Sequence, residues 1–170
     1  RRSSDLMNGG KYTITYNGNK FGATNTTTDG LTISYNKDTS ILTLNGTWSG
    51  GNIILGTMSD TIPVGDQYRM TLTYQSGSYA SSGATIAPVM DVTKNGSRYG
   101  TRTFGTTHFW YIFPTSSNKT ASGTLTIKSD VSDANGIQFW LWRSATGTVF
   151  SNYKVKVNVT KVETKLVSYN

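Results

Sequence analysis

Two tryptophans stand two residues apart near the C-terminal end of the chain, at Trp140 and Trp142. Because side chains of a β-strand alternate between its faces, residues 137–143 would place Gln138, Trp140 and Trp142 on one side, and Ile137, Phe139 and Leu141 on the other. Residues on one face lie about 7 Å apart along a strand. Sugar rings stack their C–H faces on such indoles, and their hydroxyls pair with amides. The pattern therefore predicts Trp140 and Trp142 as stacking platforms and Gln138 as a hydroxyl partner.

The same strand has a second interpretation, in which both of its faces are buried. Trp140 and Trp142 would then pack beneath a loop, and buried tryptophan is common in protein cores. The sequence leaves these two alternatives open.

A second aromatic segment, residues 108–113, offers a similar choice of faces. Phe109, Tyr111 and Phe113 form the better core face, which leaves His108 and Trp110 on the polar side as further candidate binding residues.

Other candidate contacts come from a strand at residues 68–74 and from loops. Arg69 lies on the polar face of that strand and is a candidate binding residue. Tyr79 and Tyr99 lie in Gly- and Ser-rich segments that we expect to be loops, where an exposed tyrosine could clamp a ligand. Trp48 follows Gly46 and is expected to plug the core at the end of a hairpin.

Catalytic groups are sparse in this sequence. Hydrolysis of a glycosidic bond needs two carboxyl groups that face each other across the bond, and the chain has a single glutamate, Glu163. Its aspartates mostly sit beside Gly, Ser or Asn, where turn capping is the ordinary role. Asp91 differs because it lies in an apolar segment, so it is a candidate site residue; the alternative is an edge-strand aspartate paired with Arg or Lys. A Ser–His–Asp arrangement would depend on His108, the only histidine. We predict a protein that is not an enzyme.

Metal and cofactor signals are weak as well. The chain contains no cysteine, and residues 130–133 are too sparse in acids for an EF-hand calcium loop. We predict no cofactor and no metal-ligating residue, while a structural calcium held by backbone carbonyls stays open.

The charge balance is basic, with 16 Lys and Arg against 9 Asp and Glu, a net charge of +7. Most basic residues are scattered, and Lys154 and Lys156 alternate with valines as on the solvent face of an edge strand. Such a surface suits an anionic polysaccharide or a phosphate-bearing wall polymer through long-range attraction. Nucleic-acid binding through the basic face ranks below carbohydrate binding. No apolar run reaches the roughly eighteen residues of a membrane helix, so no membrane partner is expected.

The spacing of turn motifs along the 170-residue chain is typical of an antiparallel β protein. Asn-Gly and Asp-Gly pairs, which suit tight hairpins, separate short runs in which apolar and polar residues alternate. About eight to eleven such strands indicate an all-β, two-sheet antiparallel β-sandwich, of the jelly-roll type. We expect one domain over residues 11–163, with linker or terminal segments at 1–10 and 164–170, and loops at 77–83 and 115–123. The chain opens without Met, and we interpret it as an excised domain or a proteolytic product.

Residues 29–36 and 40–47, followed by 62–72 and the final run 153–159, resemble a β-sandwich module common in tail and baseplate proteins of phages of Gram-positive bacteria. The resemblance covers about residues 29–75 and 150–163. Such modules are similar to jelly-roll carbohydrate-binding modules and are taken to hold the virion to host saccharides. The family has no invariant binding motif, so the resemblance transfers no binding residue.

The resulting expectation is a lectin-like, non-catalytic carbohydrate-binding module of a phage tail or baseplate, which mediates host adhesion through cell-surface polysaccharide. It would lie in the virion or on an extracellular surface, where it could form a homo-oligomer. The alternative from another class is a structural or oligomerisation domain of a virion or cell-surface protein, with its tryptophans buried in an interface.

Overall fold

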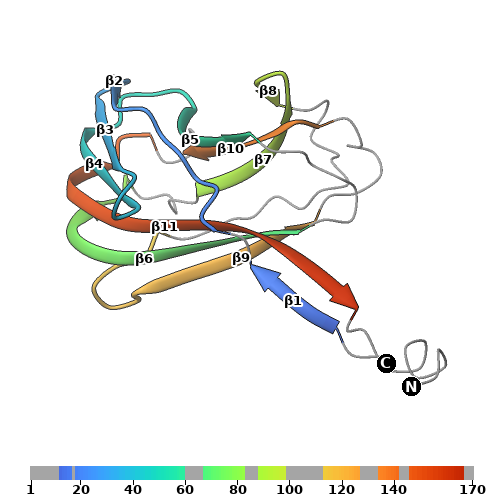
Figure 1. Cartoon of the computed structure of the whole chain (residues 1–170). Coiled ribbons are helices and arrows are strands. Elements are labelled where there is room, and N and C mark those ends of the chain that lie inside the picture. The colour runs from blue at the N-terminus through green and yellow to red at the C-terminus, as the bar shows by residue number, and fades with distance from the viewer. Residues whose placement is uncertain are drawn as a thin grey trace, which may run out of the picture.

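The computed structural model describes residues 12–16, 18–59, 67–82, 88–98, 113–126, 134–141 and 146–166. All regular structure in these residues is β-strand (Figure 1). The strands are β1 (Tyr12–Tyr16), β2 (Thr26–Thr28), β3 (Leu31–Asn36), β4 (Ile41–Thr47), β5 (Ile53–Ser59), β6 (Gln67–Ala80), β7 (Pro88–Lys94), β8 (Ser97–Arg98), β9 (Thr120–Thr126), β10 (Gly136–Leu141) and β11 (Val149–Leu166). No helix in this part of the chain is long and apolar enough to cross a membrane.

The strands form two antiparallel sheets that pack face to face. Sheet A has the order β2-β3-β4-β11-β6-β9, with β1 paired to the far part of β11, and sheet B has the order β5-β10-β7-β8. From β4 onward the chain changes sheet after every strand except between β7 and β8, which form a hairpin in sheet B. The pairs are β4 with β11, β5 with β10, β6 with β9 and β7 with β8. This winding of eight strands as nested pairs is the jelly-roll topology. The predicted fold class is confirmed.

The core forms because each long strand is apolar on one side only. On β11, Tyr153, Val155, Val157 and Val159 are buried, whereas Lys156 and Asn158 are exposed. Leu31 and Ile33 of β3, Leu42 and Leu44 of β4, and Tyr68, Met70 and Leu72 of β6 line the same core. Each fully buried aliphatic or aromatic side chain contributes about 1.5–3 kcal/mol through the hydrophobic effect.

Two predicted hairpin turns are confirmed by their backbone angles. Asp29 and Gly30 have φ of 48° and 82° and join β2 to β3; Asn95 and Gly96 have φ of 50° and 83° and join β7 to β8. Positive φ at both central residues is the type I′ geometry that matches the twist of paired strands. Asn45-Gly46 is not a turn, contrary to its motif, because both residues lie within β4.

The predicted loop at residues 77–83 is wrong for its first part, since β6 continues through Ala80. The strand can continue because it bends with β11, where the register shifts between Ser151 and Lys154. Gly77 (φ +77°) permits this bend: a Cβ there would lie 2.1 Å from the Asn152 carbonyl oxygen. The predicted loop at 115–123 is likewise shorter, because β9 begins at Thr120.

The predicted edge position of Lys154 and Lys156 is also wrong. β11 lies in the interior of sheet A, between β4 and β6. The alternation of lysine with valine reflects one solvent-facing side, which a central strand of a sandwich shares with an edge strand.

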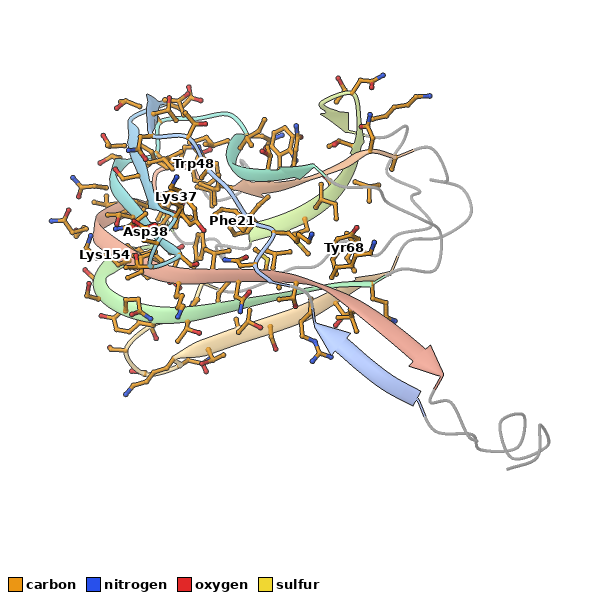
Figure 2. All side chains as sticks on the ribbon, viewed as in Figure 1. Phe21, Lys37, Asp38, Trp48, Tyr68 and Lys154 are labelled. Carbon is orange, nitrogen blue, oxygen red and sulfur yellow. The ribbon has the colours of Figure 1, made fainter. Side chains whose placement is uncertain are left out.

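Trp48 and Phe21, from segments outside the long strands, also belong to the core (Figure 2). Trp48 is fully buried and donates from Nε1 to the Gly51 carbonyl oxygen at 3.0 Å, as expected for a core plug. The Phe21 ring covers Gly56, where a Cβ would lie 2.3 Å from the ring, and packs edge-on against Phe139.

The end of β11 extends beyond the sandwich as a two-stranded ribbon with β1 (Figure 1). Tyr12 pairs with Leu166 and Tyr16 with Val162. Residues 164–166, which we expected to be linker, are therefore part of a paired strand.

Candidate functional site

Strand β10 has the alternation that the sequence predicts, but its outer side is mostly covered. Ile137, Phe139 and Leu141 lie in the core, so Gln138 and Trp140 face the outer side of sheet B. Gln138 is only 5% exposed and Trp140 is half-buried. The expected open strip is therefore a recessed surface, close to the alternative in which both faces of the strand are covered.

Asp91 lies beside Gln138 on the same outer surface, since the two residues are paired in the register of β7 and β10. It is 1% exposed. On its other side β7 pairs with β8 only at Thr93 and Lys94, so the edge-strand alternative for Asp91 stays open.

The other predicted site residues do not join this group in the described structure. Arg69 is exposed on the outer side of sheet A, on the opposite face of the sandwich, because its neighbours Tyr68 and Met70 are buried in the core. His108, Trp110 and Trp142 lie outside the described residues, as does Tyr99. Their proposed binding roles stay predictions.

A small polar pocket opens beside Gln138, which we call the Gln138 pocket. Thr57, Thr93, Gly96, Asn135 and Gln138 supply its polar lining, and its volume is about 200 Å³. Thr57 faces Gln138 from the paired position on β5. The sequence analysis missed Thr57, Thr93 and Asn135, because only the sheet register brings β5, β7 and β10 together here.

The far wall of the Gln138 pocket is the Asn95-Gly96 turn, which is held in place from two directions. The Asn135 side chain donates to Asn95 Oδ1 at 2.9 Å and accepts from the Asn95 backbone N–H at 2.9 Å. Gln138 Nε2 donates to the Gly96 carbonyl oxygen at 2.7 Å. A turn fixed in this way presents its polar groups to a ligand without a further ordering cost.

The hydrogen bond to Gly96 fixes the orientation of the Gln138 carboxamide. Oε1 is buried, and among the described residues it has no hydrogen-bond partner. Most buried polar atoms in proteins are paired, and an unpaired acceptor costs about 1–3 kcal/mol.

An apolar step adjoins the pocket at the next outward-facing pair of residues, two residues along β10 and three along β5. Trp140 on β10 is paired with Ile54 on β5, and Ile54 is 42% exposed. The described residues of the pocket lining supply hydroxyl, amide and backbone groups, and none of them has a charged side chain. A half-buried indole next to neutral donors and acceptors suits a ligand with alternating apolar and hydroxyl surfaces.

Tyr79 is not the exposed loop clamp that the sequence indicates. It lies in β6, half-buried, and donates to the Phe113 carbonyl oxygen at 2.7 Å. Its ring packs edge-on against Tyr153 at 5.2 Å, and Tyr153 donates to the Pro114 carbonyl oxygen. Burial raises the pKa of Tyr79, and it raises the pKa of Tyr153 far above the ordinary value, with the nearby Tyr79 and Tyr74 adding to the effect. These tyrosines stabilise the bend of sheet A as neutral phenols.

The carboxylates with described side chains are far apart in the fold. Asp29 and Asp38 lie in the turns at opposite ends of β3, and Asp91 lies on sheet B. Among the described residues, no three His, Cys, Asp or Glu side chains gather as metal ligands would.

Fold and site together define a jelly-roll β-sandwich with a recessed neutral pocket on one face. No family model matches the sequence, and no curated protein matches it either.

Two solved structures of carbohydrate-binding modules are similar to this chain in general fold. One, described as "xylan-binding module CBM15", has a TM-score of 0.43 and 12% identity, over 94% of this chain and 100% of that chain. The other, described as "BiXyn10A CBM1 APO", has a TM-score of 0.41 and 13% identity, over 85% of this chain and 91% of that chain. The likeness is one of general fold, and neither the site nor its ligand is inferred from it.

Proposed function

We propose that this chain is a non-catalytic carbohydrate-binding module that holds a saccharide at the Gln138 pocket and the adjoining Trp140–Ile54 step. In the finer form of the proposal, the module belongs to a phage tail or baseplate, lies in the virion or on an extracellular surface, and attaches to host cell-wall saccharide.

The observation that carries the proposal is the lining of the Gln138 pocket, whose described side chains supply hydroxyls and amides and no charge. Gln138 Nε2 donates to the Gly96 carbonyl oxygen, which orients the carboxamide. The hydroxyls of Thr57 and Thr93 can each donate and accept. This is a donor and acceptor set for sugar hydroxyls, and it contains no charge that would favour an ion.

The Trp140–Ile54 step offers an apolar surface that can contact the C–H face of the same ligand. Trp140 and Gln138 lie on one face of β10, about 7 Å apart along the strand. One sugar ring can therefore contact the indole while its hydroxyls reach the pocket. None of the described residues that line the pocket is an acid, which supports a binding role over glycoside hydrolysis.

Thr57→Val tests the pocket by affinity electrophoresis in gels that contain purified wall polysaccharide from Gram-positive cells. Valine keeps the β-branched shape that suits a strand and removes only the hydroxyl. We expect the dissociation constant to rise about fivefold, the equivalent of one neutral hydrogen bond of about 1 kcal/mol.

Thr32→Val is the matched control, because Thr32 is an exposed strand threonine on the outer side of sheet A. Equal retardation of the two variants, or no retardation of the wild type, would contradict the proposed site.

The attachment role is tested on whole cells. We expect the labelled chain to bind Gram-positive cells and to lose that binding when wall polysaccharide is removed chemically. Several copies on a virion would raise the apparent affinity without new contacts. Self-association with rising concentration and no response to any saccharide would instead identify an oligomerisation domain.

A further inference from the structure

A second depression lies on the opposite face of the sandwich, at the outer side of sheet A. It has a volume of about 460 Å³, and its polar lining comes from Asn25, Ser34, Asn36, Thr39, Thr43 and Lys154. We call it the Lys154 groove. Figure 2 shows Lys154 on the same side of the molecule as the β3–β4 turn, which carries Lys37 and Asp38.

Strand alternation fixes the direction in which Lys154 points. Its neighbours Tyr153 and Val155 are fully buried in the core, so the lysine must face outward from β11. It is half-buried, and Nζ donates to Thr43 Oγ1 at 2.9 Å from the paired position on β4. An ammonium has three donors, so this bond positions the charge while leaving it able to meet a ligand.

The lining of the Lys154 groove is asymmetric in charge. Lys154 is accompanied by amides and hydroxyls, and no carboxylate is among the described residues that line the groove. Lys156 is the next outward residue of β11, about 7 Å further along, and it is exposed. Thr73 lies opposite Lys156 on β6, which extends the hydroxyl-rich surface. The net charge of +7 adds long-range attraction for a polyanion.

The uncharged residues of the lining favour an anionic polysaccharide over a nucleic acid. Proteins that bind single-stranded nucleic acid stack bases on aromatic side chains. Tyr35, the one aromatic residue in this lining, packs edge-on against Phe21 at 5.0 Å and directs its hydroxyl to the Phe21 carbonyl oxygen at 3.4 Å. Its ring face is thus no platform for a base, whereas the surrounding amides and hydroxyls suit sugar hydroxyls.

We propose that the Lys154 groove is a second saccharide site, separate from the Gln138 pocket, which binds the negatively charged units of an anionic polysaccharide. Lys154 pairs with one anionic group of the polysaccharide, and Lys156 pairs with the next. Asn36 and Thr43 contact ring hydroxyls.

Carboxymethyl-dextran and unmodified dextran form a matched pair of probes, since they share one backbone and differ in the carboxymethyl groups that carry the charge. We expect the full chain to bind carboxymethyl-dextran more tightly than dextran, by a factor that falls as salt is raised. Lys154→Gln should weaken binding of carboxymethyl-dextran about fivefold and leave binding of dextran unchanged. Poly(glycerol phosphate) in place of carboxymethyl-dextran tells whether the groove prefers phosphate to carboxylate.

Lys119→Gln is the control for net charge, because Lys119 is exposed and precedes β9, three strands from β4 in sheet A. Equal losses in Lys119→Gln and Lys154→Gln would overturn the proposal, as would equal affinity of the wild type for both dextrans. Tighter binding of duplex DNA, with the same dependence on Lys154, would assign the groove to nucleic acid and also overturn it.

The two sites are separable by experiment. Thr57→Val should leave the difference between carboxymethyl-dextran and dextran unchanged, because Thr57 lies on the other sheet. If Thr57→Val removed that difference and Lys154→Gln did not, the second site would be refuted while the first one stood.

Discussion

Replacing Gln138 with methionine should separate stability from binding. Methionine has nearly the same length and shape as glutamine but neither its donor nor its acceptor. The variant loses the bond from Nε2 to the Gly96 carbonyl oxygen, whose N···O distance is 2.7 Å. Gly96 is exposed, so water can replace the lost donor. We put this loss at about 0.5–1.5 kcal/mol of the free energy of unfolding.

The same substitution removes an unfavourable term. Oε1 of Gln138 is buried without a partner among the described residues, which costs the folded state about 1–3 kcal/mol. The two terms sum to between about 0.5 kcal/mol of lost stability and about 2.5 kcal/mol of gained stability. Binding of wall polysaccharide should weaken about fivefold, because the Asn95-Gly96 turn that forms the pocket wall loses its hydrogen bond to residue 138. A site that costs stability while serving function has this signature.

The assay pairs urea denaturation with affinity electrophoresis of the same samples. Gln75→Met is the matched control, because Gln75 is an exposed glutamine on β6 of the opposite sheet and should change neither quantity. The reasoning is refuted if Gln138→Met loses more than about 2 kcal/mol of stability while binding is unchanged, since Gln138 would then be a structural residue.

Two further predictions concern the bend in sheet A. Burial keeps Tyr153 protonated in the folded state above its ordinary pKa of 10.0, so its contribution is complete below pH 10 and is lost as pH rises beyond it. Each pH unit above 10 should cost the wild type about 1.4 kcal/mol through this group, and Tyr153→Phe should lack that slope in chemical denaturation series; parallel slopes would contradict it. Gly77→Ala should lose about 2–4 kcal/mol, since its Cβ would lie 2.1 Å from the Asn152 carbonyl oxygen at φ +77°. Gly18→Ala, with open space around its Cβ, should change the urea midpoint little, and equal losses in both variants would refute the role of Gly77.

The features that could be predicted from sequence are local ones. Alternation identifies which side of β3, β6 and β11 enters the core, because it depends only on strand geometry. The Asp29-Gly30 and Asn95-Gly96 turns are equally local, since their residues tolerate positive φ. Trp48 was identified as a core residue on the same kind of local pattern.

The features that escaped prediction depend on sheet order. Nothing in residues 154–157 distinguishes a central strand from an edge strand, so the predicted edge position of β11 was wrong. The Gln138 pocket joins Gln138 to Gly96, which are 42 residues apart in the chain. The bend at Gly77 needs the close approach of Asn152, a residue of another strand. Such contacts follow from the order of pairing, which no single strand encodes.

The most direct test of the central claim is an NMR titration of the full, ¹⁵N-labelled chain with purified wall polysaccharide. The Gln138 side-chain amide and the backbone amides of Thr57 and Thr93 should shift together and saturate, while Gln75 on the opposite sheet stays constant. Resonances of the Gln138 pocket that remain unchanged at saturating polysaccharide would contradict the account.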